Sequence, residues 1–357
     1  MKTYIKFLSL IFLKSFFYVL LIVLSLVFLL NILSELEFFK ETDVGINYTL
    51  FLALLNSPSM IFEIFPFIFL ISAQLFFIKL FNNNELEVFK YSGLKNFSIL
   101  SILGAISVLL GILIITIFYN FSANFKNFYL EKKSQYTTDG KYLAVVTKNG
   151  LWIKDEIDEK IYIINSSNIE NNFLVNNFIT EFSKEYKVIR NISSKKIDIQ
   201  KKNWLIYDAK VYDKNEYKLY QTLEIKTNFD YKRIQTLYSN LSSLDIFQLF
   251  ELRNNYKKLN YSLTEVNLQL LKIFTYPIFL LLITIFSALI MFRVKRLDGT
   301  TIKISLGLFL SVIIYYINNF FLVMGNTERI SLILAIFTPL LLLTAVNSIM
   351  IYKIDDK

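Results

Sequence analysis

The chain has 357 residues, of which 54% are hydrophobic and only 19% are charged, and its formal net charge is +9. It contains neither cysteine nor histidine, which excludes thiolate nucleophiles, histidine bases, cysteine–histidine zinc sites and disulfide bonds. Its nine glycines form no G-x-x-x-x-G-K-[ST] loop for nucleotide phosphates. If the protein takes part in a process that needs energy, another subunit is expected to hydrolyse the nucleotide.

Long uncharged stretches predict several membrane crossings. Between Lys14 and Glu35 there are 20 uncharged residues, and between Lys95 and Lys126 there are 30. About 20 apolar residues are enough for a helix to cross the hydrocarbon core of a bilayer. We therefore predict six transmembrane helices at about 15–33, 59–78, 96–122, 266–292, 304–323 and 330–352.

The first two predicted helices are separated by an acidic stretch, 35–43, in which Lys40 is the only basic residue. Residues 44–78 are then apolar apart from Glu63, and Pro58 and Pro66 interrupt them. These 35 residues are too many for one crossing. We expect a segment that lies on the membrane surface up to about Pro58, followed by the second transmembrane helix.

The polar loop 82–95 predicts a short helix at about 83–95. Asn84 can cap its first turn, and Gly93 can end it. Glu85 and Glu87 suit the positive end of the helix dipole. Its other candidate contact residues are Leu86, Val88, Phe89 and Lys90. Such a helix has the shape with which a transport permease docks onto its ATPase, although it could also simply turn the chain between two spans.

Residues 123–265 form a separate polar domain with 23 Lys/Arg and 18 Asp/Glu. Short runs rich in β-branched and aromatic residues recur there about every ten residues, which is typical of a sandwich or jelly roll. The runs are 142–147, 151–154, 160–165, 186–192, 195–200, 204–212 and 219–227. A helix over 242–260 is expected to return the chain to the membrane.

The distribution of basic residues predicts the orientation. One set of helix ends carries twelve Lys or Arg, whereas the other short ends carry only Lys40 and Arg329. By the positive-inside rule, both termini and the loops 79–95 and 293–303 are cytoplasmic and the polar domain is on the far side. The predicted domains are 1–122 with three helices, 123–265 with β-structure, and 266–357 with three helices.

Glu63 and Lys272 are ionisable residues near the outer ends of predicted spans. Such residues are candidates for function, and here they could rim a lateral opening for a charged lipid head group. The alternative is that both side chains snorkel to the interface. No span carries a paired catalytic constellation, so an intramembrane enzyme is disfavoured, and the scattered basic residues of the polar domain do not indicate nucleic-acid binding.

Several segments resemble the LptF/LptG family of lipopolysaccharide-export permeases, over essentially the whole chain. Residues 84–86 and 92–94 are similar to the S-E-L…A-S-G stretch of the family's coupling loop. Residues 149–165, NGLWIKDEIDEKIYIIN, resemble the G-L-W-x-K-D…Y-I segment of the β-domain and favour the LptG branch. Residues 315–325 are similar to the family's fifth span, and Pro339 matches a proline of the sixth.

The resemblance implies a non-catalytic permease subunit, without cofactor or metal, in the bacterial inner membrane. It implies an LptB-like ATPase that meets Glu85, an LptF-like second permease, and LptC-like and LptA-like jelly-roll proteins in the periplasm. Lipopolysaccharide would enter laterally between the first and fifth spans, and a periplasmic jelly roll would shield its acyl chains. An open strand edge could join the next jelly roll by β-augmentation. The substrate-gate candidates are Lys40, Glu63 and Lys272.

The sequence also departs from the family pattern. Only Lys40 is available at the outer end of the first span, and Glu265 stands where the family often has an arginine. Contacts to lipid phosphates are therefore expected to be sparser, shifted or supplied by the second permease. Two alternatives remain open at this point: pairing with a second copy of the chain, and a membrane-anchored scaffold or sensor whose β-domain binds a partner protein.

Overall fold

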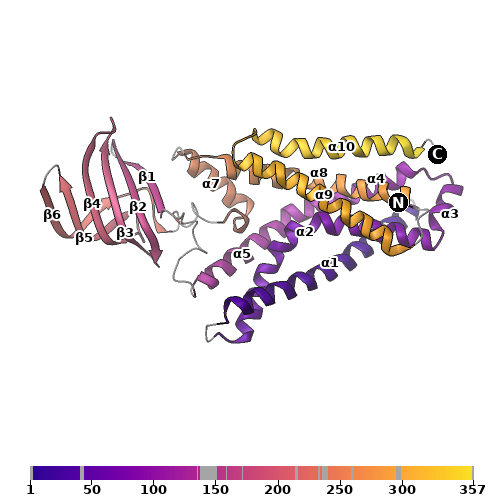
Figure 1. The fold of residues 1–357 in the computed structure, drawn as a ribbon, viewed down its shortest axis with the longest axis horizontal. Coiled ribbons are helices and arrows are strands. Elements are labelled where there is room, and N and C mark those ends of the chain that lie inside the picture. The colour runs from indigo at the N-terminus through magenta and orange to yellow at the C-terminus, as the bar shows by residue number, and fades with distance from the viewer. Residues whose placement is uncertain are drawn as a thin grey trace. The chain divides into compact units, whose positions relative to one another are not determined.

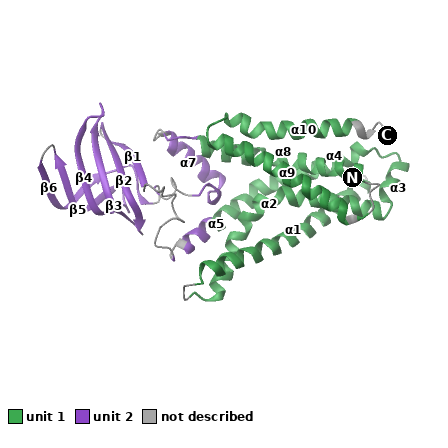
Figure 2. Ribbon diagram, in the orientation of Figure 1, with its two compact units in different colours: residues 1–126, 264–357 green, residues 127–263 purple. Residues whose placement is uncertain are grey.

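The computed structural model describes residues 3–40, 44–134, 136, 151–157, 159–170, 172–213, 216–231, 234, 240–258, 261–294 and 299–355. The chain divides into two compact units, residues 1–126 with 264–357 and residues 127–263 (Figure 2). The predicted strand 142–147 and the basic residues Lys295 and Arg296 lie outside the described residues.

The first unit is a bundle of long apolar helices (Figure 1). Its elements are α1 (Thr3–Phe38), α2 (Ile46–Asn82), α3 (Glu85–Tyr91), α4 (Asn96–Leu113), the π-helical turn η1 (Ile114–Phe118), α8 (Thr264–Arg293), α9 (Thr300–Asn326) and α10 (Leu332–Asp355). Helix α5 (Tyr119–Ser134) continues the third span. Within the described ranges, six helices are long and apolar enough to cross a membrane, which confirms the predicted class of a multi-pass helical membrane protein.

The predicted surface-lying segment before Pro58 is wrong, because α2 is one continuous helix that includes both Pro58 and Pro66. A proline inside a helix leaves the carbonyl four residues earlier without its usual donor. At Pro66 that carbonyl belongs to Phe62, and the Tyr276 hydroxyl of α8 donates to it at 2.5 Å. Neighbouring helices also surround α2, whose most apolar stretch is 72% buried. These contacts stabilise the helix across both prolines.

The helices differ greatly in burial. The most apolar stretches of α2 and α8 are 72% and 67% buried, whereas those of α1 and α9 are 22% and 11% buried. Close approach of α4 to α8 depends on small residues: a Cβ on Gly111 would lie 2.8 Å from Pro277 Cα, and Ser107 donates to Thr284 at 3.0 Å. Helices α2 and α8 therefore form the centre of the bundle.

The second unit contains a six-stranded antiparallel sheet in which neighbouring strands follow chain order. Its strands are β1 (Leu151–Ile157), β2 (Lys160–Glu170), β3 (Phe173–Ser183), β4 (Val188–Asp198), β5 (Asn203–Asp213) and β6 (Glu216–Lys226), and helix α7 (Ile246–Lys258) follows. Two strand predictions need correction. The runs 186–192 and 195–200 belong to the single strand β4, and β3 was not predicted, since Asn176 and Asn177 interrupt its alternation and Asn176 has a φ of +51°.

One face of the sheet carries a row of buried aliphatic side chains, as expected of a jelly-roll-like domain. The register aligns Ile153, Ile164, Ile179, Ile192 and Val211 across five strands. The neighbouring row is polar, and there Ser166 donates to Asn177 Oδ1 at 2.6 Å. Successive side chains alternate between the two faces of a sheet, so residues two positions apart lie on the same face. The aliphatic row and the polar row therefore share one face of this sheet.

Residues 227–229 join the two sides of this sheet, and we call them the clasp. Asn228 donates to the Asp155 carboxylate of β1 through its backbone N–H (2.9 Å) and Nδ2 (2.8 Å). The carbonyl of Phe229, one residue further, accepts from Trp204 Nε1 of β5 at 2.9 Å. In a flat sheet β1 and β5 would be about 19 Å apart. Adjacent residues can therefore bond to both strands only because the sheet is curled.

Candidate functional site

Helix α3 lies within the predicted range 83–95 but is shorter, Glu85–Tyr91, and its first turn differs from the prediction. Asn84 precedes the helix in a left-handed conformation (φ +54°), and its side chain makes no capping hydrogen bond. The predicted side-chain cap by Asn84 is therefore wrong. Instead, Asn83 Nδ2 donates to Glu85 Oε1 at 3.2 Å. The left-handed residue turns the chain sharply out of α2, which ends at Asn82.

The end of α3 follows the prediction for Gly93. This glycine has a φ of +78°, a conformation that other residues rarely adopt. Its N–H donates to the Lys90 carbonyl at 2.9 Å, and the Leu94 N–H donates to the Phe89 carbonyl at 2.9 Å. These two bonds are those of a Schellman motif, which fixes the direction in which the chain leaves the helix.

The predicted coupling residues lie on different faces of α3. Leu86 is buried, and the ring of Phe89 lies 6.0 Å from that of Phe7 in α1, so these two residues hold the helix to the bundle. Glu87, Val88 and Lys90 are exposed. So is Tyr91, whose exposed fraction is 89% and which sequence reasoning did not single out. Val88 and Tyr91 are one turn apart, and together they present an apolar and aromatic surface to solvent.

Glu85 lies at the boundary between these two faces. Its Oε1 accepts the bond from Asn83, whereas its Oε2 is buried and has no hydrogen-bond partner in the part of the chain that the structure describes. A buried acceptor without a donor is unfavourable. The carboxylate therefore has one acceptor position that no described residue fills.

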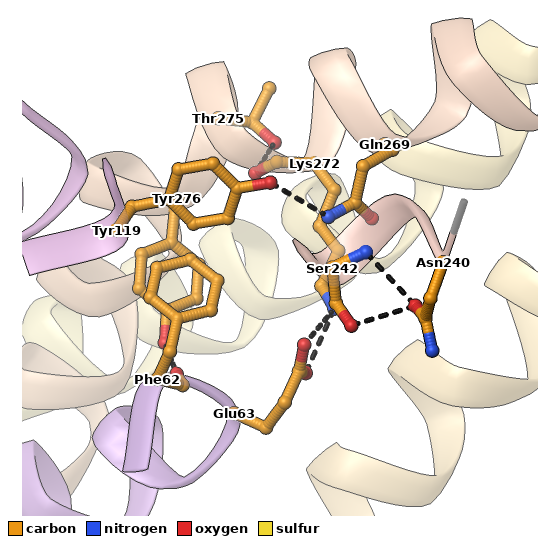
Figure 3. A network of polar contacts seen from close by, with 9 residues as sticks. All are labelled: Phe62, Glu63, Tyr119, Asn240, Ser242, Gln269, Lys272, Thr275 and Tyr276. Atoms are coloured by element: carbon orange, nitrogen blue, oxygen red, sulfur yellow. Dashed lines mark hydrogen bonds and ion pairs between the residues drawn. The ribbon is translucent and has the colours of Figure 1, made fainter. Parts of the chain in front are cut away.

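Glu63 of α2 and Lys272 of α8 form an ion pair, which sequence reasoning treated as two separate side chains. Lys272 Nζ lies 2.8 Å from Glu63 Oε2 and 3.0 Å from Oε1 (Figure 3). Half of the Glu63 side chain is exposed, against 24% of Lys272. Lys126, at the far end of the third span, is within electrostatic range of both residues. Lys40, the third gate candidate, lies exposed just after α1, where its N–H donates to the Glu37 carbonyl.

Aromatic side chains reinforce the ion pair. The rings of Phe62 and Tyr276, next to Glu63 and one turn from Lys272, stack with centroids 4.8 Å apart (Figure 3). The ring of Tyr119 lies 4.9 Å from that of Phe62. Together with the bond from Tyr276 to the Phe62 carbonyl, these contacts tie α2, α5 and α8 together at one level of the bundle.

A cavity of about 70 Å³ opens beside the ion pair. Glu63 and Pro66 line it from α2, Lys272 and Thr275 from α8, and Leu340 from α10. Helix α9 contributes Tyr315, Asn318 and Asn319. These amides were not identified from sequence, although two adjacent asparagines in an otherwise apolar span are a signal that could have marked them.

A second buried polar cluster joins α1 to α2. Asn31 Nδ2 donates to Ser57 at 3.0 Å, and Asn56 Nδ2 donates to Asn31 Oδ1 at 3.1 Å. Glu35, which the sequence places in an acidic loop, belongs to α1 and is only 1% exposed. Across the described residues there is no group of three or more acidic side chains that could hold a metal ion.

A model of the family described as "Lipopolysaccharide export system permease LptF/LptG" matches residues 8–353. The match therefore includes both units and leaves out only a few residues at each end. None of the curated proteins matches the chain.

Proposed function

The chain belongs to the LptF/LptG family of lipopolysaccharide export permeases, and from this premise we propose that it is the permease subunit of an ABC-type exporter. In this proposal the subunit extracts lipopolysaccharide from the outer leaflet of the inner membrane. It then passes the lipid to a bridge of periplasmic jelly-roll proteins, LptC-like and LptA-like. An LptF-like second permease completes the membrane pathway.

The exposed surface of α3 carries this proposal. The chain has no phosphate-binding loop of its own, so a separate, LptB-like ATPase subunit would supply the energy. Helix α3 is anchored by Leu86 and Phe89 and turns Val88 and Tyr91 outward, which is the arrangement of a helix that inserts into a groove. The coupling segment in this proposal comprises Asn84, Glu85, Leu86, Glu87, Val88, Phe89, Lys90 and Gly93, with Tyr91 added from the structure. Leu86 and Phe89 hold it to the bundle, and its exposed residues form the docking surface.

The proposed orientation places α3 in the cytoplasm. Helix α1 begins and α10 ends at the end of the bundle where α3 lies (Figure 1). The basic helix ends, with Lys79, Lys90, Lys95 and Lys303 among them, belong to the same set of ends. The positive-inside rule then puts the β-unit in the periplasm.

The substrate path follows from the two least buried spans. Helices α1 and α9 expose large apolar side chains such as Leu21 and Phe309, at 63% and 67%. In the proposed complex the second permease and the acyl chains of lipopolysaccharide cover these surfaces. Lys40, Glu63 and Lys272 remain the candidates for the polar rim of the gate.

A pull-down from detergent tests the docking surface. Wild type, Glu85→Arg and Tyr91→Arg would be purified, and the bound proteins and lipids would be identified. We expect the wild type to retain an ATPase, a second permease and lipid A species, and both variants to lose the ATPase at least tenfold. The matched control is Tyr217→Arg, since Tyr217 is 63% exposed on β6 and belongs to the other compact unit.

Two results would count against this function. If no ATPase accompanies folded wild-type protein, the docking role of α3 is wrong and the scaffold alternative becomes the better explanation. If Glu85→Arg and Tyr91→Arg both retain the ATPase at the level of Tyr217→Arg, the ATPase binds elsewhere on the chain.

A further inference from the structure

Helix α9 is held in the bundle by few contacts. Only 11% of the most apolar stretch of α9 is buried. The buried residues among those described in this helix are small: Gly307, Ser311 and Gly325. A helix with so little packing takes its position from the places where it does touch its neighbours. The contact at Gly307 is the most closely fitted of these.

The side-chain amide of Gln74, in α2, fills the space in front of Gly307. Gln74 is completely buried. A Cβ on Gly307 would overlap the amide, with Gln74 Cδ only 2.5 Å away. Glycine is therefore required at this point of α9 for as long as Gln74 stays where it is.

The same amide forms a polar link to α9. Gln74 Nε2 donates to the carbonyl of Lys303, one turn before Gly307, at 3.3 Å. Its Oε1 is buried and has no hydrogen-bond partner among the residues described. The amide thus holds α9 through one bond and keeps one buried acceptor unpaired among the described residues, which is unfavourable.

Lys303 also contacts the segment that leads into α3. Its Nζ lies 5.3 Å from the centre of the Phe81 ring, in the last turn of α2. Phe81 is three residues before Asn84, where the chain turns into α3. A continuous series of contacts therefore runs from α3 through the end of α2 to the first turns of α9.

We propose that Gln74 is a positioning residue that forms the pivot of α9 and so transmits movement of α3 to the lipid-facing part of that helix. This inference rests on the proposed function, in which α3 receives the motion of the ATPase. From Thr300 to Gly307 the helix measures about 10 Å, and from Gly307 to Asn326 about 28 Å. A small displacement at Thr300, the first residue of the helix, is therefore enlarged about threefold at the other end.

The test compares Gln74→Met with a matched control in the complete complex, in nanodiscs that contain lipopolysaccharide. Methionine has an unbranched, flexible side chain like that of glutamine but lacks the amide. The control is Ser287→Ala, which removes another buried polar link, from α8 to the Leu70 carbonyl of α2, without touching α9. We expect Gln74→Met to assemble and hydrolyse ATP normally but to move at least threefold less lipid per ATP, and Ser287→Ala to keep the wild-type ratio.

A second pair of variants separates pivoting from simple packing. Gly307→Ala should disturb folding because of the overlap with Gln74, and adding Gln74→Ala should restore the yield of folded protein. If that double variant also regains the wild-type ratio of lipid to ATP, the amide is unnecessary and the proposal is wrong. If the ratio stays low in the well-folded double variant, the amide itself is required.

Spin labels give a readout that does not depend on lipid transfer. The chain has no cysteine, so labels attach only to cysteines introduced at Phe320 of α9 and Phe274 of α8, both more than half exposed. We expect nucleotide binding to shift this distance in the wild type and not in Gln74→Met. An equal shift in both proteins, or none in the wild type, would overturn the pivot. Absence of any ATPase from the complex would instead show that the proposed function has failed, and the pivot with it.

Discussion

Two carboxylates, one in each unit, are paired with cations in contrasting ways. Glu181 of the sheet is fully buried and contacts two cations, Lys160 at 2.7 Å and Arg190. Glu63 of the bundle is half exposed and forms its ion pair with Lys272. The strand register places Glu181 directly opposite Arg190, whereas the Glu63 pair depends on how two helices pack. The first arrangement is suited to stability, and the second leaves charge available at the edge of a cavity.

The largest difference should appear when each carboxylate is removed. Glu181→Ala removes the partner of two cations that are 46% and 32% exposed, and hydrogen bonds between charged groups contribute about 2 kcal/mol. Both tryptophans, Trp152 and Trp204, belong to the sheet, so tryptophan fluorescence during unfolding in detergent reports on this unit. Glu63→Ala should leave that transition unchanged. Equal shifts in the two variants would refute the contrast.

A charge exchange examines the pair in the bundle. Glu63→Lys places two cations within about 3 Å of each other, and we expect a loss of about 1 kcal/mol, since the site is half exposed. The double variant Glu63→Lys with Lys272→Glu restores opposite charges and should recover most of that loss. The yield of monodisperse protein and its thermal midpoint are the measurements. A double variant no better than the single one would show that the ion pair contributes nothing to packing of α2 on α8.

The smallest expected effect is the dependence of the stability of the sheet on pH. Burial alone would raise the pKa of Glu181, but hydrogen bonds and charge from Lys160 and Arg190 outweigh it and lower this pKa. Its contribution to stability is therefore complete above the unfolded pKa of about 4.3 and is lost as the pH falls through the folded value. The hydrogen bond and charge of Glu181 raise the pKa of Lys160, whose contribution is complete below about 10.4 and is lost as the pH rises further.

Comparison with Glu181→Gln isolates this dependence from that of other groups. Between pH 3 and 6, the difference in unfolding midpoint between wild type and Glu181→Gln should grow with pH, and near pH 11 it should shrink again. A difference that is constant over the whole range would mean that Glu181 does not titrate as part of this cluster.

Sequence patterns predicted the membrane spans well because composition alone governs them. Helix α1 is the most apolar span, at a hydropathy of 2.8, yet it is among the least buried. Apolarity thus indicates that a helix enters the membrane but not which helix lies at the centre, since lipid and protein are equally apolar neighbours. The central position of α2 and α8 depends on glycines, serines and single hydrogen bonds, which leave no periodic signal.

The candidate site was only partly predictable for the same reason. The limits of α3 and the turn at Gly93 follow from local residue types. The pair Glu63–Lys272 and the bond from Gln74 to Lys303 join residues 209 and 229 positions apart, so no local pattern contains them. In the sheet, β3 was missed because its left-handed Asn176 breaks the alternation on which strand prediction depends.

The clasp has a consequence for the order in which the unit that contains the sheet is made. Each strand pairs with the one just synthesised, so hairpins can form one after another as the chain emerges from the membrane. The bonds between Asp155 and Asn228 connect residues 73 positions apart and become possible only after all six strands have been made. We expect the sheet to remain open along one side throughout synthesis and to close in a final, slower step. In that interval its aliphatic row is exposed to solvent.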